Sequence, residues 1–103
     1  MTNFELDERL GIHVPALQQE WDQFSTQERE RILYKWEEIR GTIPNRIFDL
    51  EQMINYKQDQ LFDEDDFEKS CQLNAEIAEL ASQINDLHIW YRVNQDVRSK
   101  VHS

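Results

Sequence analysis

Few side chains of this 103-residue sequence are of the types that carry out catalysis, and they do not form a familiar catalytic pattern. The single cysteine, Cys71, lies between Phe67 and Leu73 on a predicted helix, so we expect it to be buried and to act as a small apolar side chain. His88 could pair with Asp96, but no Glu has a His three residues later, which is the spacing that di-metal sites in helical bundles use. We therefore expect His88 to lie at the surface or at the edge of the core.

Four consecutive acidic residues are the strongest candidates for binding a cation: Asp63, Glu64, Asp65 and Asp66. An EF-hand loop also requires a central Gly, which is missing here, so we expect weak binding of divalent ions at most. The sequence contains neither a Gly-rich phosphate loop nor a Gly-x-Ser-x-Gly elbow. We therefore expect no enzymatic activity, no cofactor, no metal site and no small-molecule substrate, and a metal-dependent enzyme is only a distant third hypothesis.

The net charge is -10, from 21 acidic and 11 basic residues. This charge is uneven, because residues 63–80 carry seven acidic residues and one basic residue. Direct binding to nucleic acid needs clustered Lys and Arg, so we expect none. The acidic segment can be explained as a solvated loop with favourable charges at a helix start, or as a patch that attracts a basic partner.

Nothing in the sequence indicates a membrane or an oxidising compartment. A single cysteine cannot form an intramolecular disulfide, and no basic start followed by an apolar run is present. No window approaches 18 consecutive apolar residues, and the helical faces are rich in Glu instead of Lys. We expect a cytoplasmic protein that does not bind membranes.

The composition predicts an all-α domain. Two Gly and two Pro leave few places for tight turns, while 39% hydrophobic residues, including three Trp and five Phe, are enough for a core. We expect residues 1–103 to form a single helical domain, in which residues 1–14 are loosely ordered and residues 98–103 are a tail. A short helical turn over Phe4–Leu10 would end at Gly11, and the spacing of the apolar residues predicts a first helix from Pro15 to Ser25.

Capping and periodicity predict three further helices. Ser25 and Glu28 form a capping box, so a second helix should run to about Arg40, with its buried stripe at Ile32, Trp36 and Ile39. Pro44 predicts a break or sharp kink after Gly41. A third helix follows, with an apolar stripe at Ile47, Leu50, Ile54 and Leu61 that is interrupted by Lys57.

The fourth helix should run from about Asp66 to Val97, with a heptad seam at Leu73, Ile77, Leu80, Ile84, Leu87 and Tyr91. Helices two and three, placed end to end, would match its length. The economical architecture is a small antiparallel bundle of about four helices, built on a long, bent helical hairpin with helix one across one end. A second stripe of small residues, Cys71, Ala75, Ala78 and Ser82, would allow close approach of a second chain, so a homodimer is plausible.

The candidate protein-binding residues are mainly those of the fourth helix: Phe67, Leu73, Ile77, Leu80, Ile84, Leu87, Trp90 and Tyr91. Aromatic residues and Arg are enriched at binding hot spots, which is why Trp90 and Tyr91 are included. The simpler interpretation of Trp90 is that it covers the second helix at Trp36.

Part of the sequence resembles a known interaction motif. The segment Ile47–Leu80 contains Leu50-Glu51, Ile54, Asp66-Phe67-Glu68-Lys69, Leu73 and Glu76-Ile77-Ala78-Glu79-Leu80. This pattern resembles the UVR motif, a helical hairpin of excision-repair subunits and of adaptors of Clp and protein-arginine-kinase systems. The stretch between Ile54 and Phe67 is about one helical turn longer than in the motif. The resemblance implies association through the hairpin, with contacts at Phe67, Leu73, Ile77 and Leu80.

Two functions therefore compete. The leading hypothesis is a protein–protein interaction module or adaptor that acts through its helical hairpin and that self-associates. The alternative is an acidic inhibitor or nucleic-acid mimic that binds the basic surface of a nucleic-acid-handling protein, with Asp63, Glu64, Asp65 and Asp66 at its contact. Mimicry requires carboxylates spaced like phosphates along one exposed face.

Overall fold

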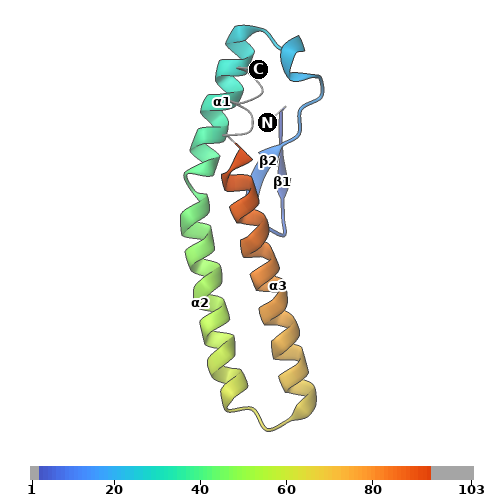
Figure 1. Ribbon diagram of the computed structural model, residues 1–103, viewed down its shortest axis with the longest axis vertical. Helices are drawn as coiled ribbons and strands as arrows, with labels where there is room; N and C mark the ends of the chain where they lie inside the picture. The colour runs from blue at the N-terminus through green and yellow to red at the C-terminus, as the bar shows by residue number, and fades with distance from the viewer. Residues whose placement is uncertain (1–2, 94–103) are drawn as a thin grey trace.

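The computed structural model describes residues 3–93, which form an elongated, mostly helical rod (Figure 1). The elements in chain order are β1 (Phe4–Asp7), β2 (Ile12–Pro15), the 3-10 turn η1 (Trp21–Gln23), α1 (Thr26–Arg40), α2 (Ile43–Phe62) and α3 (Phe67–Tyr91). The rod measures 59 × 22 × 20 Å, and its radius of gyration of 18.0 Å exceeds the roughly 13 Å of a compact domain of this length. One end carries α1, both strands and the C-terminal part of α3, and the other end is the turn between α2 and α3.

One half of the predicted capping box of α1 is confirmed, whereas the reciprocal hydrogen bond from the Ser25 N–H to the Glu28 carboxylate is not found among the described residues. Ser25 is the N-cap, and its hydroxyl accepts a hydrogen bond from the Glu28 N–H at 3.1 Å. The predicted buried residues of this helix, Ile32, Trp36 and Ile39, all lie in the core. The sequence therefore predicted both the first turn of α1 and the face that it buries.

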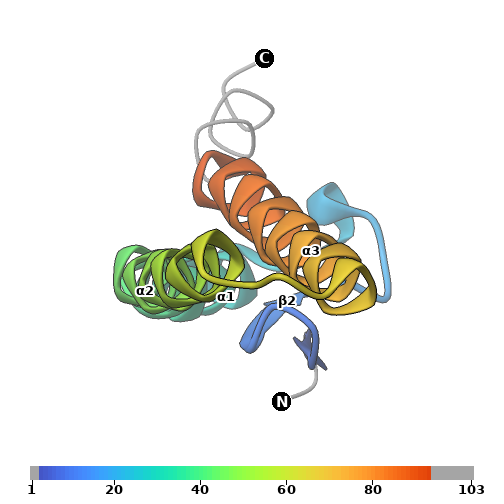
Figure 2. The ribbon, with the colours of Figure 1, turned by 90° about the horizontal axis from the view of Figure 1, so that it is seen from below.

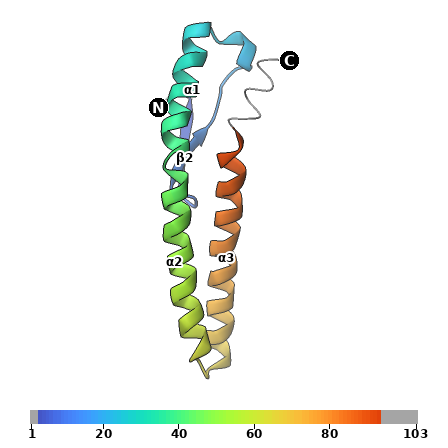
Figure 3. The same ribbon diagram turned by 60° about the vertical axis from the view of Figure 1, so that its left-hand side comes forward.

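The junction between α1 and α2 is a break without a sharp kink. Gly41 and Thr42 keep right-handed helical φ and ψ, and the Gly41 N–H still donates to the Glu37 carbonyl at 3.0 Å. Pro44 lies in the first turn of α2, where its missing N–H costs no helical hydrogen bond. As a result α1 and α2 run nearly end to end with a gentle bend between them (Figure 3), which confirms their predicted arrangement.

Helix α3 runs antiparallel to α2, as predicted, and the two helices form the body of the rod (Figure 1). Asp66 is the N-cap of α3, and its carboxylate accepts a hydrogen bond from the Lys69 N–H at 3.1 Å. The predicted end of this helix at Val97, the possible pairing with Asp96 and the tail over residues 98–103 lie outside the described residues.

The all-α prediction is wrong at the N-terminus, where a two-stranded antiparallel sheet replaces the predicted helical turn over Phe4–Leu10. In this sheet Phe4 pairs with Pro15 and Asp7 with Ile12. The connecting turn forms because the Gly11 N–H donates to the Asp7 carbonyl at 2.8 Å and Gly11 adopts a positive φ of 73°. Residues 3–14 are thus ordered by packing, since the core includes Phe4, Leu10 and Ile12.

The predicted helix from Pro15 to Ser25 is also wrong. Only Trp21–Gln23 forms a short 3-10 turn, so residues 3–93 contain three α-helices instead of about four. Phe24 is nevertheless buried, and Trp21 packs partly against the core. Figure 2, a view along the rod, shows the strands on one side of the column of α1 and α2 and its neighbour α3.

The positive φ of Gly11 predicts that a larger residue at this position lowers the stability of the fold. A Cβ at this position would approach the Arg46 Nε atom to 3.0 Å, and Arg46 Nε donates to the Leu10 carbonyl at 2.9 Å. We expect Gly11→Ala to lower the free energy of unfolding by about 1 to 2 kcal/mol, because it combines a strained φ with a disturbed hydrogen bond. The matched control is Gly41→Ala, since Gly41 has an ordinary φ of -64°. Urea denaturation should show Gly41→Ala to be neutral or stabilising by up to about 1 kcal/mol, and equal losses in both variants would contradict this explanation.

One arginine holds the strand hairpin against α3. Arg9, in the turn between the strands, donates to Glu79 at 2.6 Å, to Asp86 at 2.7 Å and to the Ser82 hydroxyl at 2.8 Å. The hydrogen bond from Arg9 is the main reason that the pKa of Glu79 lies below its ordinary value of 4.5. The Arg9 contacts therefore fix how far along α3 the strand hairpin reaches.

This contact predicts a pH dependence. Because the pKa of Glu79 is lower in the folded chain than in the unfolded one, its stabilising effect is present above about pH 4.5 and is lost as the pH falls below it. We expect Arg9→Gln to melt at a lower temperature than the unmodified protein at pH 7, and the two midpoints to converge at pH 3. A gap between the midpoints that stays constant from pH 7 to pH 3 would refute this assignment.

Candidate interaction surface

The predicted heptad seam packs within the chain, and its burial decreases along the rod. Near the strands Leu87 is fully buried, and Leu50 of α2 is only 1% exposed. Leu80 is also buried, whereas Leu73 and Ile77 are half-buried. The predicted contact residues Leu80 and Leu87 are therefore buried within the chain. Leu73 and Ile77, nearer the turn, keep surface for a partner, as does the half-buried Ile84 between Leu80 and Leu87.

The seam is less buried toward the turn because fewer elements pack around it there. Arg9 brings the strand hairpin as far as Glu79, and no other described element packs against the segment beyond it. We call residues 54–78, which comprise the last turns of α2, the connecting turn and the first half of α3, the distal hairpin. A two-helix hairpin covers only one side of each helix, so Ile54, Leu61 and Leu73 stay half-buried.

Two aromatic side chains stand exposed at the end of the distal hairpin. Phe62, the last residue of α2, is 91% exposed, and Phe67, the first residue of α3, is 81% exposed. They flank the acidic run from Asp63 to Asp66, and we call residues 62–67 the hairpin tip. Each ring is thus available to a partner, and aromatic side chains are enriched at the binding hot spots of interfaces.

The acidic run has a structural role at the tip. Besides the cap by Asp66, the Glu64 carboxylate accepts a hydrogen bond from the Asp66 N–H at 3.0 Å. Asp63 ends α2, and Asp65 is exposed. The prediction that this run supplies a turn and a helix start is confirmed, and the four carboxylates are confined to one short loop.

The prediction that Cys71 is buried is wrong, because its side chain is exposed. It belongs with Ala75, Ala78 and Ser82 to a stripe on α3 that does not face α2, and all four residues are exposed. Ser82 is covered in part by Arg9. His88 is exposed, as predicted, and within residues 3–93 no three His, Cys, Asp or Glu side chains lie together in a way that could hold a metal ion.

The interpretation of Trp90 as a cover for the second predicted helix is confirmed. Its ring meets the Trp36 ring edge-on, with centroids 5.9 Å apart and planes at 69°. The exposed ring of Tyr91 lies 4.6 Å below the Arg40 guanidinium, and Arg40 also donates to the Tyr91 carbonyl at 3.2 Å. Both aromatic residues therefore join the end of α3 to α1.

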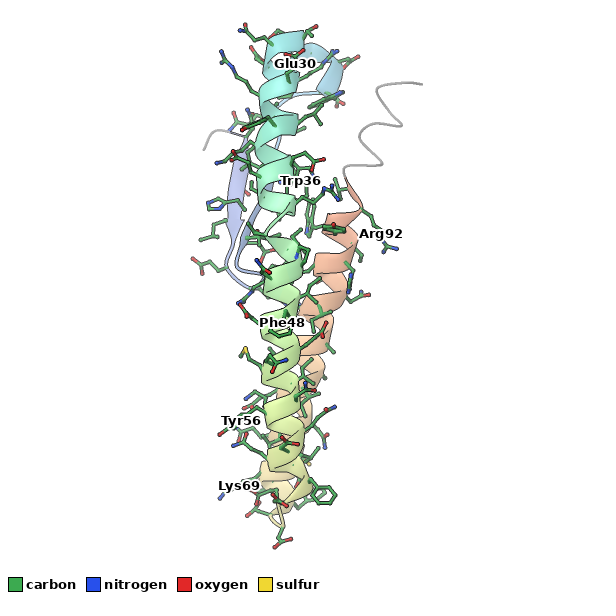
Figure 4. The ribbon with its side chains drawn as sticks, turned by 90° about the vertical axis from the view of Figure 1, so that its left-hand side faces the viewer. Glu30, Trp36, Phe48, Tyr56, Lys69 and Arg92 are labelled. Carbon is green, nitrogen blue, oxygen red and sulfur yellow. The ribbon has the colours of Figure 1, made fainter. Side chains whose placement is uncertain are left out.

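Two features were not anticipated from the sequence. The Lys57 ammonium pairs with the Glu76 carboxylate at 2.8 Å across the distal hairpin, and this hydrogen bond lowers the pKa of Glu76. Phe48 and Tyr56 are exposed on the outer face of α2 (Figure 4). Both residues lie outside the predicted apolar stripe. A search for apolar residues on the opposite face of the helix would have been needed to identify them.

Comparisons with protein-family models, with curated proteins and with solved structures found no match for this chain. Within residues 3–93 the helices lack the combination of length and apolar character that a membrane span requires.

Proposed function

We propose that this protein is a protein–protein interaction module that binds its partner through the distal hairpin. The observation that carries the proposal is the unequal packing of the rod, whose apolar seam is buried near the strands and half-open toward the tip. A hairpin that ends in Phe62 and Phe67 presents large, rigid apolar groups, and such groups dominate the energy of protein interfaces.

The chemistry of the tip suggests the chemistry of its partner. Phe62 and Phe67 would enter apolar pockets, while the acidic run between them would face basic residues. Such charges mainly speed association and select the partner, whereas the aromatic anchors supply affinity. The resemblance of residues 47–80 to the UVR hairpin supports the same mode of binding. A second copy of the chain, seated along the half-open seam, is the self-associating form of this proposal.

The alternative, an acidic inhibitor that imitates nucleic acid, has weaker support. Its carboxylates would have to follow one exposed face, but those of the tip lie within one loop, and Asp66 and Glu64 are engaged in local hydrogen bonds. Two exposed aromatic rings beside them also have no counterpart in a phosphate backbone.

Site-specific cross-linking tests the proposal, because it does not require the partner to be identified first. A photoreactive phenylalanine analogue is placed at Phe67, and in a matched protein at Tyr34, which is 71% exposed on α1 and far from the tip. After illumination in cells we expect a discrete cross-linked protein from the Phe67 position and none from the Tyr34 position, because only the tip is held against a partner.

The mass of the cross-linked species distinguishes a second copy of the chain from another protein. The proposal fails if the Phe67 position yields no discrete product. It also fails if both positions yield the same products, because a specific interface contacts the tip and not α1.

A further inference from the structure

Helix α2 carries a row of exposed residues on its outer face, the side turned away from α3 (Figure 4). We call this row the outer stripe, and it consists of Asn45, Phe48, Gln52, Tyr56 and Asp59. A helix turns about 100° per residue, so these five positions fall within an arc of about 80°. The buried residues of α2, such as Ile43 and Leu50, lie on the opposite side of the helix.

The two aromatic rings of the outer stripe are not used by the fold. Phe48 is 60% exposed and Tyr56 is 66% exposed, and neither is part of the core that residues 3–93 form. Charged side chains make up 31% of the chain, yet within the stripe Asp59 alone carries a charge. Aromatic rings with few charges are typical of the centre of a protein interface, whereas a solvated helix face is usually charged.

The spacing of the outer stripe is symmetric about Gln52. Phe48 lies four residues before Gln52, and Tyr56 lies four residues after it. Asn45 and Asp59 lie seven residues before and after the same position. A two-fold axis beside Gln52 would therefore place two antiparallel copies of α2 side by side, with Phe48 of each copy opposite Tyr56 of the other. In the same arrangement Asn45 lies opposite Asp59, and Gln52 lies opposite its own copy.

Each pair in this arrangement is chemically matched. The ring of Phe48 can pack against that of Tyr56, and the Asn45 amide can donate a hydrogen bond to the Asp59 carboxylate. The Gln52 amide both donates and accepts, so it can pair with its own copy. No carboxylate of one stripe faces a carboxylate of the other, although each chain has a net charge of -10. This match at every position favours a second copy over an unrelated protein.

We propose that the outer stripe of α2 binds the outer stripe of a second copy, in an antiparallel, two-fold dimer centred on Gln52. This inference goes beyond binding through the distal hairpin, because the stripe includes neither the seam nor the two rings of the tip. One pair of helices buries less surface than a standard interface, so we expect a weak dimer, with a dissociation constant on the order of 10 to 100 μM. Raising the salt concentration should strengthen the dimer, because salt screens the repulsion between two acidic chains.

Disulfide cross-linking tests the position of the two-fold axis. The complete protein carries Gln52→Cys or Gln58→Cys, each combined with Cys71→Ser, because Cys71 is exposed. Gln58 is a matched control, since it is exposed on the same helix but lies outside the stripe. Helices in contact have axes about 8 to 10 Å apart, which brings the two copies of position 52 within reach of a disulfide. The two copies of position 58 would lie about 18 Å apart along the helix axes, so we expect cross-linking at position 52 alone.

Sedimentation equilibrium over a range of concentrations measures the strength of the dimer. The double variant Phe48→Ser, Tyr56→Ser should dimerise at least about tenfold more weakly and keep its stability, because both rings are exposed in the free chain. Phe67→Ser removes an exposed ring at the tip and should dimerise as the unmodified protein does. This control separates the outer stripe from self-association through the tip.

Four results would each overturn the proposal. The first is a monomer at about 500 μM in high salt, well above the expected dissociation constant. The second is equal cross-linking at positions 52 and 58, and the third is a dimer that weakens as the salt concentration rises. The fourth is a dimer that is lost in Phe67→Ser but kept in Phe48→Ser, Tyr56→Ser, which would support self-association through the tip.

Discussion

Replacing Leu87 with Ala is expected to lower the free energy of unfolding by about 3 to 5 kcal/mol, the upper part of the range for Leu-to-Ala changes in cores. Leu87 is 0% exposed, and the core around it also contains Ile43 and Leu50 of α2. Removing its side chain takes away apolar burial and leaves a cavity where α1, α2 and α3 come together. Because a small domain is stabilised by only about 5 to 15 kcal/mol, this variant should be close to unfolding.

The matched variant is Leu73→Ala, on the same seam of the same helix but within the distal hairpin. Leu73 is half-buried, so its loss should cost less than half as much as the loss of Leu87. Urea denaturation of both variants measures the difference. Equal costs would mean that the seam is packed uniformly along the rod and that the distal hairpin is not half-open.

The double variant Phe62→Ser, Phe67→Ser is expected to weaken partner binding at least about 100-fold, because each exposed ring would serve as an anchor of the interface. Stability should change little, since neither ring is buried in the free protein. Binding of the partner identified by cross-linking, measured by calorimetry or by light scattering for a second copy, provides the readout. Tyr34→Ser, which removes a ring that is 71% exposed on α1, should bind normally.

Neutralising the acidic run separates the two proposed functions. The change Asp63→Asn, Glu64→Gln, Asp65→Asn, Asp66→Asn keeps the shapes of the side chains, and Asn can still cap α3. For an interaction module anchored by aromatic rings, we expect a loss of only a few-fold, mainly in the association rate at low salt. If neutralisation abolished binding while the loss of both rings had no effect, the nucleic-acid mimic would be the better explanation.

The helical part of the fold could be predicted because its signals are local and strong. Ser25 and Glu28 set the start of α1, and the four-and-three spacing from Leu73 to Tyr91 set the inner face of α3. The end-to-end order of α1 and α2 followed from helix length alone. These features depend on hydrogen bonds within a few residues, or on a periodicity sustained over many turns.

The N-terminal segment could not be predicted in this way. Asp7 and Gly11 fit the end of a short helix as well as the turn of a strand hairpin, and the choice depends on contacts with distant residues such as Arg46 and Glu79. The spacing of Leu17, Trp21 and Phe24 indicated a helix, yet these side chains belong to irregular chain and a single 3-10 turn. Short segments follow tertiary packing more than their own pattern.

The candidate site was predictable only in part. The seam identified which residues face α2, but periodicity does not tell how many layers cover them. The exposure of Phe62, Phe67 and Cys71 follows from the lack of a third layer along residues 54–78, and that lack depends on where the strand hairpin ends.

Amide hydrogen exchange along α3, measured in the protein alone and in complex with its partner, tests the central claim most directly. In the protein alone we predict fast exchange from Ser70 to Ile77 and slow exchange from Leu80 to Leu87, because burial rises along this helix. The partner should slow exchange in the first segment and leave the second nearly unchanged. Uniform protection of α3 in the free protein, or protection by the partner near Leu87 alone, would contradict association through the distal hairpin.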